Sequence, residues 1–163
     1  MERKKIKPYF AVCFTFLIAS VITIFPLSSN LWWLKPHWLT LVLIYWVIFL
    51  PNVIGVIAGF FVGILIDLLK GTPFGSTGLV LAFIAFLTIM LRMRLRQFRF
   101  WQQFAVVIFL VGLEQLLYLW LQLALGSSSV VGMKYWSSAG ISIIMWPILF
   151  LLLRSYQRRL KLL

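Results

Sequence analysis

The stretch that decides the fold is GVIAGFFVGILIDLLKGTPFG, residues 55–75. Its small residues recur every four positions and lead to a carboxylate, in the order Gly55, Gly59, Gly63 and Asp67. On a helix this spacing makes one stripe that carries no bulky side chain before the carboxylate. Such a stripe lets two backbones approach closely, so the spacing predicts a central and tightly packed helix.

A turn is predicted directly after this helix. Gly71 supplies the left-handed backbone that commonly follows a helix, and Pro73 prevents the helix from continuing. Gly75 then precedes the next apolar run. The residues predicted to serve helix packing or partner contact are Gly55, Gly59, Gly63, Asp67, Gly71 and Gly75.

The composition is that of an integral membrane protein. The chain has 163 residues, is 63% hydrophobic and has a mean hydropathy of +1.06. Only 11% of its residues are charged, against roughly a quarter in a soluble domain. The net charge of +12 comes from clusters beside apolar segments, which favours a role in topology and in contact with anionic lipids over nucleic-acid binding.

Six apolar segments are bounded by prolines, glycines, charges and interfacial aromatic residues. We predict one all-α membrane domain over residues 1–163. Its six transmembrane helices are expected at about 9–25, 35–50, 53–69, 74–91, 101–125 and 137–153.

The distribution of basic residues predicts the orientation. With the amino terminus in the cytoplasm, all but three of the 15 Lys and Arg residues fall on the cytoplasmic side; the exceptions are Lys35, Lys70 and Lys134. By the positive-inside rule, both termini are expected to be cytoplasmic. Beyond the amino-terminal cluster, the predicted cytoplasmic basic residues are Arg92, Arg94, Arg96, Arg99, Arg154, Arg158 and Arg159.

Four polar residues are predicted to lie inside the membrane, namely Asp67, Glu114, Tyr118 and Gln122. A buried charge in lipid is costly unless it is paired, solvated or protonated. For Asp67, an ion pair with Lys70 at i+3 is one solution, whereas Glu114 has Tyr118 and Gln122 on its own helix face. Structural bonding, a shared ligand cavity and ion translocation all remain open, and structural bonding is favoured.

No constellation of catalytic or metal-binding residues is recognisable. His37 is the only histidine and is expected to be a hydrated residue at the membrane interface. Cys13 is the only cysteine, so an intrachain disulfide is excluded. We therefore expect a protein that is not an enzyme and has no catalytic, metal or cofactor site.

These features together resemble one known family. GFFVGILIDLLKGTPFG follows KPHWLTLVLIYWVIFLP and precedes an inner loop with four arginines and then WQQ; Trp146-Pro147 lies in the last apolar segment. Over nearly its whole length the chain resembles the MreD family of rod shape-determining membrane proteins of Gram-negative bacteria. The resemblance implies a multi-pass protein of the bacterial inner membrane, without catalytic residues, and a fold similar to the S components of energy-coupling transporters.

The resemblance also implies a function and partners. It implies a non-enzymatic scaffold of the cell-elongation (Rod) complex that supports rod shape and lateral peptidoglycan synthesis. MreC is the expected direct partner, and MreB, RodA and a class B penicillin-binding protein are expected in the same complex. On this interpretation the glycine stripe either holds the helix packing or receives the transmembrane helix of MreC.

The alternative comes from a different class of protein. It is a substrate-binding membrane subunit of a small-solute transporter. It would need an outward-open pocket around the aromatic and polar residues Trp32, Trp33, His37, Asp67 and Glu114.

Overall fold

The computed structural model describes residues 3–24, 36–51, 53–97, 100–126 and 133–159. These residues form six α-helices and no strand. Their bounds are α1 Arg3–Ile24, α2 Trp38–Phe49, α3 Val56–Lys70, α4 Ser76–Gln97, α5 Phe100–Ala124 and α6 Met133–Arg159. The all-helical fold class predicted from the sequence is confirmed.

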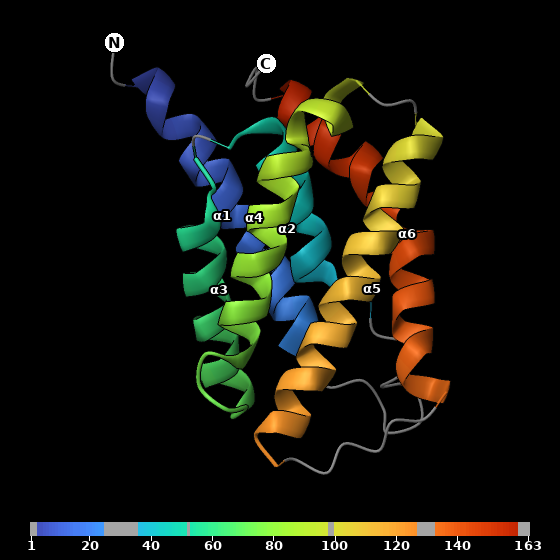
Figure 1. Ribbon diagram of the computed structural model, residues 1–163. Helices are drawn as coiled ribbons and strands as arrows, with labels where there is room; N and C mark the ends of the chain where they lie inside the picture. Colours follow the sequence, from blue (N-terminus) through green and yellow to red (C-terminus); the bar gives the residue numbers. More distant parts are fainter. Residues whose placement is uncertain (1–2, 25–35, 52, 98–99, 127–132, 160–163) are drawn as a thin grey trace.

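The helices form a bundle in which successive elements run in opposite directions (Figure 1). The start of α1 and the end of α6 lie at one end of the bundle, which we call the terminal end. The short turn between α3 and α4 lies at the opposite end, which we call the far end. The figure thus places the basic last turns of α4 and α6 together at the terminal end.

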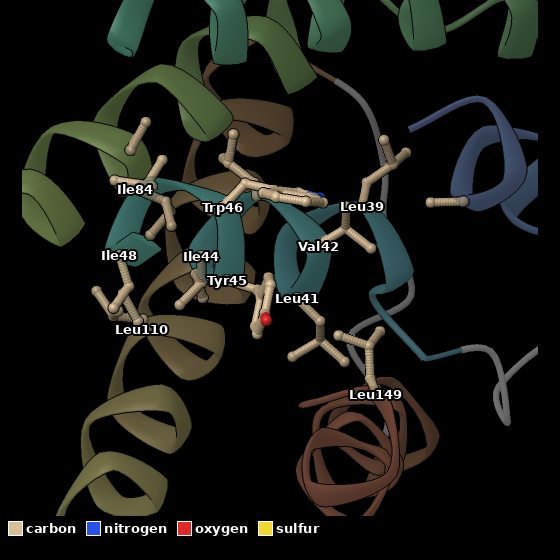
Figure 2. Close-up of a cluster of buried hydrophobic side chains, with 14 of the residues drawn as sticks. Leu39, Leu41, Val42, Ile44, Tyr45, Trp46, Ile48, Ile84, Leu110 and Leu149 are labelled. Atoms are coloured by element: carbon tan, nitrogen blue, oxygen red, sulfur yellow. The ribbon is translucent and has the colours of Figure 1, made fainter. Parts of the chain in front are cut away.

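Helix α2 is the centre of the bundle. Every residue from Leu39 to Ile48 is buried, and α2 packs on α1, α4, α5 and α6. Figure 2 shows its side chains pointing in several directions, toward Ile84 of α4, Leu110 of α5 and Leu149 of α6. A helix that is apolar all round and buried on all sides satisfies the rule for a core helix.

The prediction that the glycine-rich helix is central is therefore wrong. Helix α3 packs chiefly on α4. Its opposite face exposes large apolar side chains such as Ile57, Phe61 and Leu68. Small residues permit close packing against one neighbour, but they do not require the helix to be surrounded.

Two side-chain hydrogen bonds fasten α2 to its neighbours within the apolar core. Trp46 Nε1 donates to Thr15 Oγ1 of α1 at 2.8 Å, and Tyr45 Oη donates to Gln157 Oε1 of α6 at 2.7 Å. Buried aromatic residues with a polar tip usually find such partners. These bonds help to fix the rotation of α2 in a largely apolar core.

The outer surface of the bundle suits lipid. Large apolar side chains are exposed on the other five helices, α1, α3, α4, α5 and α6. Within the part of the chain that the structure describes, three helical stretches are long and apolar enough to cross a membrane: Ser76–Gln97, Trp101–Ala124 and Ser137–Arg159. Pro8–Ile24 and Trp38–Phe49 are shorter apolar helices. An apolar exterior of this extent marks a membrane protein.

Candidate functional site

Glu114, near the middle of α5, contacts the start of α2. Its Oε1 accepts a hydrogen bond from Thr40 Oγ1 at 2.6 Å and lies 3.2 Å from Nδ1 of His37. Both Thr40 and Glu114 are buried, and the His37 side chain is 26% exposed. One carboxylate oxygen thus holds the first turns of α2 against the middle of α5.

Helix α6 completes this arrangement with two serines. The backbone N–H of His37 donates to Ser142 Oγ at 2.8 Å, and Ser142 in turn donates to the carbonyl of Ser138 at 2.7 Å. Ser138 Oγ lies 3.3 Å from His37 Nε2. We call His37, Thr40, Glu114, Ser138 and Ser142 the polar clamp, because together they join α2, α5 and α6.

The second carboxylate oxygen of Glu114 differs from the first in its hydrogen bonding. Glu114 Oε2 is buried and has no hydrogen-bond partner among the residues that the structure describes. A buried acceptor without a donor costs roughly 1–3 kcal/mol, and more if it carries charge. Among the described residues, the clamp therefore uses only one of the two carboxylate oxygens of Glu114.

Asp67 belongs to a separate network at the turn between α3 and α4. Its side chain is fully buried. Its carboxylate accepts hydrogen bonds from Thr72 Oγ1 at 2.8 Å and from the backbone N–H of Thr77 at 2.9 Å. Ser76 Oγ at 3.3 Å and the N–H of Gly78 at 3.4 Å lie at longer range.

This second network, which we call the turn network, is a helix cap made across a turn. Thr77 and Gly78 belong to the first turn of α4, whose N–H groups have no partner within the helix. A carboxylate at that position satisfies them and also interacts favourably with the helix dipole. Asp67 therefore has a structural partner that did not figure in the sequence interpretation based on Lys70.

The two carboxylates do not share hydrogen-bond donors. Tyr118 and Gln122 follow Glu114 at i+4 and i+8 on α5. Of the four polar residues that the sequence places inside the membrane, Glu114 thus belongs to the polar clamp and Asp67 belongs to the turn network.

The glycines predicted as one stripe have different surroundings. A Cβ on Gly63 would meet the backbone of Gly78, with the Gly78 nitrogen 2.5 Å away, and a Cβ on Gly59 would lie 3.2 Å from the Leu81 carbonyl. A Cβ on Gly55 would have no neighbouring atom within 4 Å. Helix α4 therefore occupies the stripe at its two central positions.

Gly71 and Gly75 are turn residues. Their φ angles are +66° and +88°, a region that favours glycine, and a Cβ on either would have no neighbour within 4 Å. They shape the connection that presents Thr72 and Ser76 to Asp67.

The basic residues lie at the terminal end of the bundle. Arg94 and Arg96 of α4 and Arg154, Arg158 and Arg159 of α6 are exposed, and Arg92 is partly buried. The Arg154 guanidinium lies 5.8 Å from the centre of the Phe150 ring. Arg99 lies outside the described residues, as do Trp32 and Trp33.

Sequence reasoning missed most of the polar clamp. His37 was expected to be a hydrated interfacial residue, but three-quarters of its side chain is covered and it faces Glu114. Thr40, Ser138 and Ser142 carried no motif. The available signal was that a lone intramembrane glutamate requires a partner, and that His37 and Thr40 lie one turn apart at a helix start.

A double-mutant cycle tests whether the two networks act separately. Changing His37 and Glu114 to alanine should give a coupling of about 1–3 kcal/mol in the free energy of unfolding, because the two residues share one bond. Glu114→Ala and Asp67→Asn should be additive within about 0.5 kcal/mol. The measurement is denaturant titration in detergent micelles. Strong coupling between the two acids would instead mean that they occupy one common site.

The fold and the site together define a class of protein. The bundle is a small helical membrane protein whose buried polar residues bind one another and join helices. Among the described residues, no group of three or more His, Cys, Asp or Glu side chains is placed to hold a metal ion.

Comparison with known proteins identifies the family. The family model described as rod shape-determining protein MreD matches residues 3–156. The rod shape-determining protein MreD of Haemophilus influenzae is 31% identical over 165 residues, covering 99% of each chain. The chain therefore belongs to the MreD family of shape-determining membrane proteins, as the sequence resemblance predicted.

No solved structure matches this chain. The expected likeness to S components of energy-coupling transporters therefore stays a prediction.

Proposed function

We propose that this protein is a non-enzymatic scaffold of the cell-elongation complex in the bacterial inner membrane. The observation that carries the proposal is membership of the MreD family over almost the full length of the chain. The six proposed spans follow from the six apolar segments, and the proposed cytoplasmic position of both termini follows from the positive-inside rule. The basic turns of α4 and α6 would then face the cytoplasm and its anionic lipids.

The proposed partners are those of the elongation complex. MreC is the direct partner, and MreB, RodA and a class B penicillin-binding protein belong to the same assembly. The described residues are almost entirely helical, so helix faces and helix ends are the surfaces that they offer to these partners. Because α4 fills the glycine stripe at Gly59 and Gly63, the helix of MreC is expected on another face.

The bonding of the polar residues supports a scaffold over a solute-binding subunit. Such a subunit needs polar groups that converge on an open cavity. In this protein Asp67 accepts bonds from its own turn, and Glu114 accepts bonds from Thr40 and His37. The polar side chains thus hold helices to one another.

Depletion followed by microscopy and purification tests the proposed function. We expect depleted cells to lose rod shape and become round, and the tagged protein to recover MreC from solubilised membranes. A tagged six-helix membrane protein of another family is the control and should recover no MreC. Rod-shaped cells after depletion, or equal recovery of MreC by the control, would contradict the proposal.

A further inference from the structure

An apolar groove lies between α1, α2 and α6. Its volume is about 300 Å³. Buried residues of the three helices, among them Ala19, Val42 and Leu149, line it, while Ile18 and Leu152 line it from α1 and α6 and are exposed. The groove is therefore open to the surroundings of the bundle along the line where α1 and α6 face each other.

The groove exists because α1 and α6 both pack on α2 and leave space between them. The rings of Phe14 and Tyr156, one from each helix, stack at 6.4 Å between centroids. Both rings also line the groove. Helices α1 and α6 thus contact each other through these two rings, and the groove between them stays open.

The chemistry of the lining selects a hydrocarbon. Thr15 is the hydroxyl-bearing residue that faces the groove besides Tyr156, and its Oγ1 already donates to the Val12 carbonyl and accepts from Trp46. The Thr15 hydroxyl is therefore already hydrogen-bonded within the protein and is not free to bind a ligand in the groove. An occupant within the membrane is therefore stabilised by van der Waals contact with the lining.

The dimensions of the groove suit a single acyl chain. Its α6 lining, from Ile148 to Tyr156, extends over about 12 Å at 1.5 Å per residue. An acyl chain is much narrower than a helix, which is about 10 Å across. An extended acyl chain is thin enough to lie within it.

A positive charge lies where the headgroup of such a lipid would be. The residues of α6 that line the groove recur at helical spacing through Leu149, Leu153 and Tyr156, and the same spacing leads to Arg159. Arg159 is exposed in the last turn of α6, about 4.5 Å along the axis beyond Tyr156. Arginine is well suited to bind a phosphate.

We propose that this groove binds one acyl chain of an anionic phospholipid, whose phosphate is held at Arg159. The lipid fills the space between α1 and α6 and joins the first helix of the bundle to the last. The inference rests on the groove and on Arg159 alone, so it stands or falls independently of the proposed function.

The test is native mass spectrometry of the full-length protein in detergent, with phosphatidylglycerol or phosphatidylethanolamine added. The wild-type protein should retain one phosphatidylglycerol. Ile18→Trp, which fills the groove from its exposed edge, should lower this retention about tenfold. Ile108→Trp is the matched control, because Ile108 is a similarly exposed residue on α5, outside the groove. It should retain lipid as the wild type does.

Two further variants keep the test decisive. Leu152→Trp fills the groove from α6 and should repeat the result of Ile18→Trp, with unchanged thermal unfolding as the check on folding. Arg159→Gln should abolish the preference for phosphatidylglycerol over phosphatidylethanolamine, and Arg94→Gln on α4 should preserve it.

Three results would overturn the proposal. The first is undiminished retention of phosphatidylglycerol by both tryptophan variants. The second is equal retention of the two phospholipids by the wild-type protein. The third is a co-purified protein, in place of lipid, that both tryptophan variants lose.

Discussion

Replacing Gly63 by alanine is expected to remove most of the protein from the membrane fraction. The added Cβ would meet the backbone of Gly78 and the carbonyl carbon of Thr77, 2.7 Å away. Backbone atoms of a helix cannot rotate aside as a side chain does, so α3 and α4 must separate. The cost is expected at the upper end of the range for overpacking, about 3 kcal/mol or more.

Gly112→Ala is the matched control for this prediction. Gly112 also lies inside a helix, but a Cβ there has no neighbour within 4 Å. Alanine is the better helix former, so this variant should be as abundant as the wild type or slightly more so. Membrane abundance, thermal unfolding in detergent and recovery of MreC should be measured for both. Normal values for Gly63→Ala, or for the larger Gly63→Leu, would refute the role assigned to the contact between α3 and α4.

Replacing Asp67 by alanine is expected to have the second large effect. The change leaves the N–H groups of Thr77 and Gly78 without their acceptor and removes the partner of Thr72. Bonds to a charged acceptor contribute about 1.5–3 kcal/mol each in favourable cases, and a lost cap costs about 1 kcal/mol. We expect a loss of roughly 2–4 kcal/mol in the free energy of unfolding.

Asp67→Asn separates the structural role from a role for the charge. An asparagine oxygen can accept from the two backbone N–H groups, while its NH₂ faces the hydroxyls of Thr72 and Ser76, which can accept. We therefore expect Asn to cost about 1 kcal/mol and to keep the rod shape of cells. Loss of shape by an Asn variant of normal abundance and stability would contradict a structural role and favour proton transfer.

The sequence predicts the helical class of this protein well, because composition and clustered charges leave little alternative. It also identifies the glycines at which two helices come close. It does not reveal which helix lies at the centre. In a soluble protein, an all-round apolar helix such as α2 would be recognised as the core, but lipid-facing helices are equally apolar. Tyr45 and Trp46, each with a polar tip, distinguish α2 only once their partners are known.

The candidate site is less predictable for a related reason. Asp67 and Glu114 are conspicuous in an apolar chain, and the need for partners follows from physics. The partners themselves are ordinary residues: backbone N–H groups for Asp67, and a threonine and a histidine for Glu114. Single serines and threonines are common in membrane helices, so no spacing rule selects Ser138 or Ser142 in advance.

The bond between Tyr45 and Gln157 has a consequence for biosynthesis. It joins residues 112 positions apart, so α2 leaves the ribosome long before its partner on α6 exists. Until then, the 12-residue helix α2 packs only on the helices already synthesised, and the hydroxyl of Tyr45 lacks its acceptor on α6. The centre of the bundle is thus completed by α6, which is synthesised after the other five helices described here. A chain truncated before α6 lacks one side of its core. We expect cellular quality control to degrade such a chain.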